Sequence, residues 1–479
     1  MDLEGAKGLA EKALAKALAS GATYAEARIQ KTWERQFVLK NGEAQPSFFS
    51  EGYGVGIRAM CGGALGFAAT NDMKAASVSE MAGKVAKMAK ASSALLSKPI
   101  TFDSSKAARK KWAPPEKTRV EEADASWMRS VLGDMDGRIS DGKAGVKIPG
   151  RLLLLDAELE EKYYVNSDGA RVEARLPRIF FFGSLTAVEG ADTVQRFVEL
   201  GETGGLEVVK RVGFVDRIET EAKTLAKVLK TASKPPTDTV DVVLGPELSG
   251  IAAHESVGHP QEADRVLGRE GAQAGESYLK ANSLGTKVGS PEANVSDDPT
   301  LLHSMGYTPV DDEGVEGKKR RLIKDGVINE FLQNRATASE FGIASNGASR
   351  SVSFDREPII RMSNTFVEPG DYTTEELIKE VRHGVLIKSF TEWNIDDKRL
   401  NQRYVGLEAN LIERGEVMGL VRAPVLEITT PRLWGSVKAR SKHMEFEAAV
   451  CGKGDPSQGA PVWTGGPETL LGGIRLGAR

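Results

Sequence analysis

The chain has 479 residues, with 64 Lys and Arg against 67 Asp and Glu, so its formal net charge is −3. This length predicts two or three domains, and the near balance of charge argues against a nucleic-acid partner, because such proteins usually present a basic face. The two cysteines, Cys61 and Cys451, are fewer than a secreted disulfide framework needs, and no stretch approaches the roughly 18 apolar residues of a membrane span. We therefore expect a cytoplasmic protein without a nucleic-acid or membrane partner.

The first 235 residues alternate helix-like and strand-like patterns. Apolar residues between Ala6 and Leu18 recur at helical spacing and lack the unbroken apolar core of a secretory signal. Further helices are predicted over 75–95 and 218–230, and a polar loop over 101–117. Cys61 follows an apolar run and is expected to be a buried small hydrophobe. Short β-prone runs predict strands at 24–30, 35–40, 54–60, 64–69, 151–155, 160–166, 170–181 and 184–188.

The composition changes near residue 236, where Pro235 and Pro236 lie in a polar segment typical of a linker. We predict an α+β protein with two domains. Residues 1–235 form an N-terminal domain of mixed helices and strands, and residues 236–479 form a β-rich C-terminal domain that carries a metal-binding helix. In this second part, Gly-rich turns separate short strands, and helices are expected after Pro246, near 335–342 and over 374–382.

The segment His254-Glu255-Ser256-Val257-Gly258-His259 has the spacing H-E-x-x-x-H, one residue longer than the common zinc-peptidase motif H-E-x-x-H. Residues five apart lie about 140° apart on an α-helix, whereas residues four apart lie about 40° apart. The helix must therefore end, kink or bulge if both imidazoles are to bind one ion. Gly258 tolerates unusual dihedral angles and Pro260 blocks continuation, so we expect His259 to leave the helix and fold back. The alternative is that both histidines merely cap a buried helix.

A catalytic zinc site usually has three protein ligands and one open position. Cys451 is the favoured third ligand, because a thiolate binds zinc well and the nearby Lys453 would help to keep it ionised. Cys451 could instead be a buried small residue. Three other histidines are alternatives that fit structural positions better: His303 in a polar loop, His383 at a predicted helix end, and His443 in a charged stretch.

Six motifs in this order resemble the TldD/PmbA family of peptidases, also described as modulators of DNA gyrase. The motifs are GVGIR at 54–58, GFA at 66–68, HESVGH at 254–259, DDEG at 311–314, PIIRMSNT at 358–365 and CGKG at 451–454. The resemblance implies a Zn²⁺ peptidase whose metal is held by His254, His259 and Cys451, with Glu255 as general base. Because the chain keeps these residues, it resembles the catalytic, TldD-like branch. Family members form dimers with an enclosed active site, so the expected partner is a second copy or a PmbA/TldE-like paralogue.

The expected reaction is hydrolysis of short or unfolded peptides, in which zinc activates a water and Glu255 accepts its proton. The competing interpretation is a non-enzymatic modulator with a structural zinc. Glu255 and a three-ligand set favour the enzyme, since structural zinc sites usually have four closed protein ligands.

Two further features are compatible with more than one role. Asp311, Asp312 and Glu313 lack the alternating ligand spacing of a calcium loop, so a turn or a substrate-facing loop is favoured over a cation site. Arg361 is compatible both with binding a peptide carboxylate or carbonyl and with a structural role.

Overall fold

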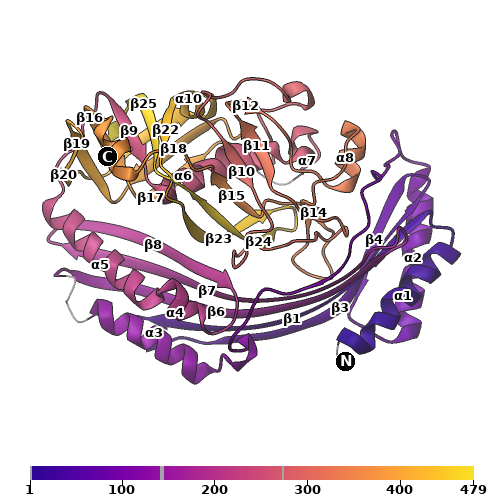
Figure 1. Cartoon of the computed structure of the whole chain (residues 1–479). Helices are drawn as coiled ribbons and strands as arrows, with labels where there is room; N and C mark the ends of the chain where they lie inside the picture. Colours follow the sequence, from indigo (N-terminus) through magenta and orange to yellow (C-terminus); the bar gives the residue numbers. More distant parts are fainter. Residues whose placement is uncertain (1–2, 141–144, 272–274) are drawn as a thin grey trace.

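The structure is a computed structural model that describes residues 3–140, 145–271 and 275–479. Within these residues the N-terminal half forms an eight-stranded sheet, in the order β4-β3-β1-β6-β7-β5, with β2 on β1 and β8 on β7. The sheet is strongly curved and its concave face holds the C-terminal half of the chain (Figure 1). Its strands are β1 (Tyr24–Lys40), β2 (Glu43–Ala44), β3 (Phe48–Cys61), β4 (Ala64–Thr70), β5 (Arg109–Trp112), β6 (Lys147–Asn166), β7 (Arg171–Glu189) and β8 (Asp192–Thr203).

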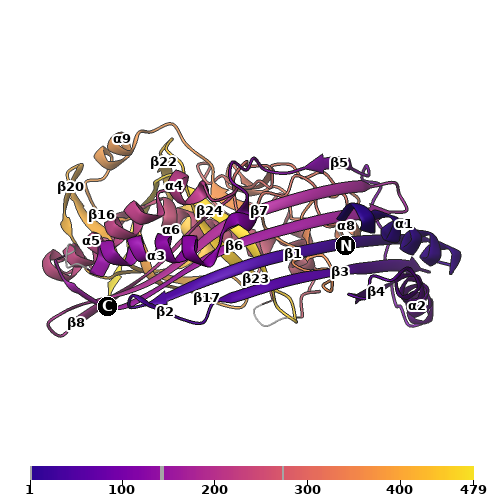
Figure 2. The ribbon, with the colours of Figure 1, turned by 90° about the horizontal axis from the view of Figure 1, so that it is seen from below.

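Helices cover the convex face of this sheet at its two ends (Figures 1 and 2). At one end lie α1 (Leu3–Ala19) and α2 (Ala75–Ser93), and at the other α3 (Ala125–Ser140), α4 (Val208–Val212) and α5 (Phe214–Thr231). Because side chains alternate along a strand, the two faces of β7 differ: Ile179 and Phe181 are buried against the helices, whereas Arg178 and Phe182 line cavities on the concave face. Cys61 is buried in the α1–α2 core, as predicted.

Three long strands were each predicted as two shorter ones, and this was wrong. The predicted pairs are 24–30 and 35–40 in β1, 151–155 and 160–166 in β6, and 170–181 and 184–188 in β7. In β6 the predicted gap contains Asp156 and Glu158, which interrupt the apolar pattern but lie on the concave face and line a cavity beside the C-terminal half. In β7 the gap is Phe182 and Gly183, and glycine is a poor strand former. The sequence also did not predict α3 and β8, and β5 lies within the predicted loop 101–117.

The C-terminal half is β-rich, as predicted. Among the described residues its largest sheets have the orders β20-β19-β16-β9-β25-β22 and β12-β11-β10-β15-β24-β23, beside a four-stranded sheet β17-β18-β21-β26 and the pair β13-β14. The strands are β9 (Thr239–Leu244), β10 (Val295–Asp297), β11 (Arg320–Lys324), β12 (Val327–Ile328), β13 (Ser349–Arg350), β14 (Ile359–Ile360), β15 (Asn364–Val367), β16 (His383–Ile387), β17 (Phe390–Ile395), β18 (Asn401–Gly406), β19 (Ala409–Glu413), β20 (Glu416–Leu420), β21 (Pro424–Thr429), β22 (Val437–Arg440), β23 (Glu445–Lys453), β24 (Gln458–Gly466), β25 (Thr469–Arg475) and β26 (Gly477–Ala478).

Short helices lie between these strands. They are α6 (Pro246–Ala253), α7 (Ala263–Val266), α8 (Arg335–Phe341), α9 (Thr374–Lys379) and α10 (Thr430–Gly435). The helices predicted after Pro246, near 335–342 and over 374–382 are therefore confirmed. The third ends earlier than expected, and His383 opens strand β16 instead of ending a helix.

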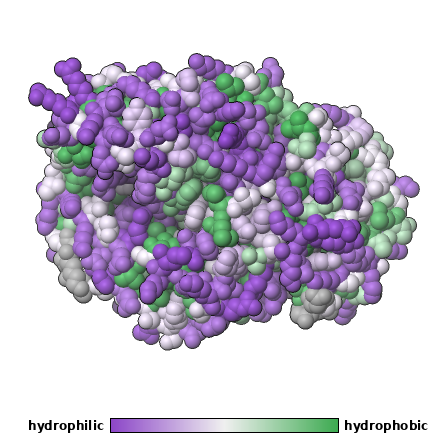
Figure 3. Space-filling model, in the orientation of Figure 1, coloured by the Kyte–Doolittle hydropathy of each residue, from purple (hydrophilic) through white to green (hydrophobic). Residues whose placement is uncertain are grey.

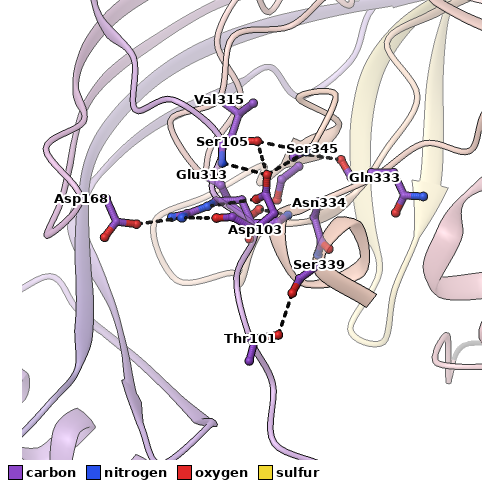
Figure 4. Close-up of polar contacts among 12 residues, drawn as sticks. Thr101, Asp103, Ser105, Asp168, Glu313, Val315, Gln333, Asn334, Ser339 and Ser345 are labelled. Atoms are coloured by element: carbon purple, nitrogen blue, oxygen red, sulfur yellow. Dashed lines mark hydrogen bonds and ion pairs between the residues drawn. The ribbon is translucent and has the colours of Figure 1, made fainter. Parts of the chain in front are cut away.

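The two halves are joined by polar contacts as well as by the chain itself (Figure 4). Asp103 accepts a hydrogen bond from the backbone of Ser345 at 3.0 Å, and the hydroxyls of Thr101 and Ser339 lie 2.7 Å apart. The expected boundary at residue 236 falls between the end of α5 and the start of β9. The division into two domains at this residue stays a prediction.

No helix within the described ranges combines the length and apolar composition needed to cross a membrane. The face shown in Figure 3 is largely hydrophilic, with scattered apolar patches.

Candidate metal centre

The segment that carries the two motif histidines begins at a strand-to-helix turn. Strand β9 ends at Leu244, and Pro246 opens helix α6, a position that suits proline because the first helical N–H has no intrahelical acceptor. The helix packs closely on strand β24: a Cβ at Gly250 would lie 2.5 Å from the backbone nitrogen of Gly465. This close contact fixes the position of α6 relative to β24.

The extra residue of the motif is accommodated by a π-turn over His254–Gly258. The backbone N–H of His259 donates to the carbonyl of His254, the i→i+5 bond of a π-helix. One widened turn brings residues five apart onto the same face, and the ring centroids of His254 and His259 lie 5.0 Å apart. Of the three options the sequence left open, the bulge is the one adopted. The expectation that His259 leaves the helix was wrong, since its φ of −58° and ψ of −48° are helical.

Gly258 also has a different role from the one expected. Its φ of −58° and ψ of −63° lie in the ordinary right-handed region, so no unusual dihedral angle is needed. A Cβ at this position would lie 1.9 Å from the sulfur of Met362. A side chain at residue 258 would therefore displace Met362, which packs against the π-turn.

Strand β23 brings Cys451 to the two histidines. The Cys451 sulfur lies 3.5 Å from Nε2 of His259, and ligand atoms of His254, His259 and Cys451 all lie within 4.8 Å of one another. All three side chains are buried. The other histidines lie elsewhere: His303 is near the Thr203 carbonyl, His383 contacts Glu413, and His443 contacts Glu445.

A carboxylate behind His259 orients its ring. Nδ1 of His259 lies 3.0 Å from Oε2 of Glu262, which also accepts a hydrogen bond from Arg265 at 2.6 Å. Burial alone would raise the pKa of Glu262, but the charges of Lys453, Arg265 and His259 hold it well below its usual value. The ionised carboxylate favours a proton on Nδ1 and leaves the Nε2 lone pair directed toward Cys451, as in many metal-bound histidines.

The protonation states suit metal binding. Burial lowers the pKa of both His254 and His259, which favours neutral imidazoles. Burial raises the pKa of the Cys451 thiol, but His259 and Arg361 outweigh this effect and bring it to about 7. Lys453, the cation expected to lower this pKa, is not among its larger causes, and its ammonium binds Asp264 at 2.7 Å and Glu262 at 3.3 Å.

The donor set fits zinc. Two imidazoles and a thiolate are common zinc ligands, and bonds of about 2.0–2.3 Å separate tetrahedral ligands by roughly 3.3–3.8 Å. The 3.5 Å between Cys451 and His259 falls in this range. Among the described residues, the buried Nδ1 of His254 has no hydrogen-bond partner. A ring nitrogen of His254 is therefore free to bind a metal ion.

These residues line one cavity of about 710 Å³ between the concave face of the N-terminal sheet and the C-terminal half. His254, Glu255, His259 and Cys451 form part of its wall, together with Arg399. The Arg399 guanidinium forms a buried ion pair with the Glu255 carboxylate. The opposite wall carries Phe182 and Phe197 of β7 and β8, with ring centroids 6.0 Å apart.

Two candidate features of the sequence are structural. Arg361 is buried, and its guanidinium donates to the carbonyls of Cys451 and of Gln458, the latter at 2.7 Å. It braces the β23–β24 hairpin and does not line the cavity.

The acidic run at 311–313 forms a buried turn, and Asp311 and Asp312 line a cavity of about 300 Å³ beside the N-terminal sheet. Asp311 accepts backbone hydrogen bonds from Glu313 and Val315, and Asp312 binds Lys162 of the N-terminal sheet at 3.1 Å. Glu313 binds Arg58 at 2.7 Å.

Sequence reasoning missed Glu262 and Arg399. Glu262 could have been found, because it lies three residues after His259, a spacing at which side chains meet on a helical turn. Arg399 is 144 residues from Glu255, and no local pattern connects them.

Comparisons with known proteins point to metallopeptidases. Residues 237–478 match the PmbA/TldA metallopeptidase C-terminal domain, 25–89 match domain 1 and 111–230 match the central domain. The chain is 30% identical, over 92% of its length and 94% of the relative's, to a protein of Methanocaldococcus jannaschii named as a metalloprotease. It is 29% identical, over 51% of its length and 53% of the relative's, to a protein of Saccharolobus solfataricus named as a zinc metalloprotease TldD homolog. The crystal structure of TldE from Thermococcus kodakarensis has the same fold, with a TM-score of 0.72 at 19% identity over 98% of this chain and 100% of that one.

Proposed function

Because this chain belongs to the PmbA/TldD family of metallopeptidases, we propose that it is a zinc-dependent peptidase that hydrolyses short or unfolded peptides. The observation that carries the proposal is the grouping of His254, His259 and Cys451 in a cavity that also contains Glu255. Three protein ligands leave one coordination position for water or substrate, which is typical of catalytic zinc sites and not of structural ones.

In this proposal His254, His259 and Cys451 hold the ion, and Glu255 is the general base. Bound zinc would supply an activated water and polarise the scissile carbonyl. The Glu255 carboxylate accepts a proton from that water and passes it to the nitrogen of the leaving amine. Glu262 keeps the His259 ring in one orientation throughout, because Arg265 and Lys453 hold the carboxylate in place.

The edge position of β23 supports a peptide substrate. This strand ends its sheet, and residues 447–452 line the cavity. An extended peptide can add to such an edge through main-chain hydrogen bonds, with its carbonyl near Cys451 and the two histidines. A folded protein does not present a free extended segment, so we expect selectivity for short or unfolded chains.

We further propose that the protein acts in the cytoplasm as a dimer, with a second copy or with a PmbA/TldE-like paralogue. The low number of cysteines supports a reducing compartment. Enclosure of the cavity by a partner would add to the selectivity against folded substrates, and size-exclusion chromatography with light scattering measures the assembly.

The test uses the purified full-length chain. Its zinc content is measured, and cleavage of one protein in folded and unfolded forms is compared with and without chelator. We expect bound zinc, cleavage of the unfolded form and loss of cleavage on chelation. Bound zinc without cleavage of any peptide would favour the non-enzymatic modulator, and equal cleavage of both forms would contradict the proposed selectivity.

A further inference from the structure

Arg399 occupies a strained position in the turn between β17 and β18. Its φ is +63°, a left-handed conformation that costs free energy for residues other than glycine and is usually filled by Gly or Asn in turns. The turn is nevertheless well held: the N–H of Arg399 donates to the Asp396 carbonyl at 2.9 Å, and Thr430 Oγ1 donates to the Arg399 carbonyl at 2.8 Å. Strained residues of this kind cluster at functional sites.

The side chain at this position reaches into the metal cavity. Arg399 is 8% exposed and Glu255 is 4% exposed, and Nη1 of Arg399 donates to Oε2 of Glu255. A carboxylate this buried needs a compensating charge. A planar guanidinium also restricts the direction in which the carboxylate points, because its N–H donors are fixed in one plane.

We propose that Arg399 is a positioning residue, which holds the Glu255 carboxylate in the orientation that proton transfer requires. This inference rests on the proposed role of Glu255 as general base. The left-handed backbone at residue 399 supports it: glycine would relax the turn but would leave Glu255 without this partner. The arginine is unfavourable for the left-handed backbone of the turn, but its side chain forms the contact with Glu255.

The experiment measures kcat, KM and zinc content for wild type, Arg399→Gly and Arg399→Lys in the full-length protein. Since the guanidinium acts through Glu255 and not on the substrate, kcat should fall in Arg399→Gly by roughly 10–100-fold, less than the full contribution of a general base, while KM and zinc content stay unchanged. Arg399→Lys should recover only part of kcat, because an ammonium keeps the charge without the planar donors.

Chemical rescue separates positioning from a general effect on folding. Millimolar guanidinium ion should raise the kcat of Arg399→Gly and leave the kcat of wild type and of Glu255→Ala unchanged. Urea at the same concentration, as the uncharged control, should change the kcat of none of the three. Wild-type kcat in Arg399→Lys or in Arg399→Gly would overturn the proposal. A parallel loss of zinc and activity without rescue would show that Arg399 only maintains the fold.

The Glu255→Ala variant distinguishes failure of the proposed function from failure of the positioning role. If Glu255→Ala cleaves peptides at the wild-type rate, the proposed base is wrong and the role of Arg399 fails with it. If Glu255→Ala is inactive but Arg399→Gly is fully active, the proposed function stands and only the positioning role is wrong.

Discussion

Two buried clusters of polar and charged residues differ in whether they face the metal cavity. At the interface between the two halves, Arg58 binds Glu26 at 2.9 Å and Glu313 at 2.7 Å, and Tyr24 donates to Glu26 at 2.6 Å. We call these four residues the interface cluster. None of them lines the metal cavity, and their carboxylates are matched by donors from the protein itself.

The metal cluster, His254, Glu255, His259 and Cys451, is equally buried but is not closed. Its residues face the 710 Å³ cavity, and within the described chain Nδ1 of His254 has no hydrogen-bond partner. Burial and charge alone therefore do not distinguish a structural cluster from a reactive one. What sets the metal cluster apart is that three zinc-type ligand atoms meet beside a cavity, and four predictions test this difference.

The largest effect should come from Cys451→Ser. Loss of the thiolate should reduce zinc affinity by more than the roughly 10–100-fold that follows loss of an outer-shell partner, and cleavage should disappear with the metal. Cys61→Ser is the matched control, because Cys61 is buried between α1 and α2, away from the cavity. Elemental analysis and a peptide assay measure both quantities, and equal zinc occupancy in the two variants would rule out Cys451 as a ligand.

Glu255→Ala should separate metal binding from catalysis. Zinc content should stay near that of wild type, because no ligand is removed, whereas kcat should fall by about 10²–10⁴-fold, the usual contribution of general acid–base catalysis. Steady-state kinetics on zinc-loaded protein measure the change. Cleavage at the wild-type rate would show that the base is another group.

Arg58→Met should affect stability and not chemistry. It leaves Glu26 and Glu313 buried without their cation, and breaking a buried ion pair costs about 3–5 kcal/mol of unfolding free energy. The control is Lys84→Met, whose partner Glu80 is exposed on a helix surface and whose loss should cost no more than about 0.5 kcal/mol. Urea unfolding measures both variants. A drop in kcat per zinc-loaded, folded chain would mean that the interface cluster contributes to the reaction.

A pH-dependent effect concerns Asp156, which lines the cavity on the concave face together with Glu34 and Glu158. Burial, followed by the charges of Glu34 and Glu158, raises its pKa to about 8, whereas its pKa in the unfolded chain is about 4. Between these values only the unfolded state releases the proton, so this group lowers stability as pH rises from 4 to 8. Asp156→Asn should therefore raise the unfolding midpoint at pH 8 and leave it unchanged near pH 4. A gain that is equal at both pH values would contradict the raised pKa.

The sequence alone predicted the α+β class, the helix after Pro246 and the motif histidines, because these depend on periodicity and spacing over a few residues. It also singled out Cys451, since few other zinc ligands were available. The long strand β6 was split in prediction, because local hydrophobicity does not reveal that Asp156 and Glu158 lie on a face that meets the second half of the protein.

Tertiary structure decided the rest of the site. The H-E-x-x-x-H spacing requires a break in helical regularity, but only the packing of Met362 against Gly258 shows how the π-turn fits in the core. Cys451 meets His259 across 192 residues, and Arg399 meets Glu255 across 144. Such pairings depend on the path of the chain through several sheets. The sequence determined which side chains can bind zinc and accept a proton, and the fold alone determined that they share one cavity.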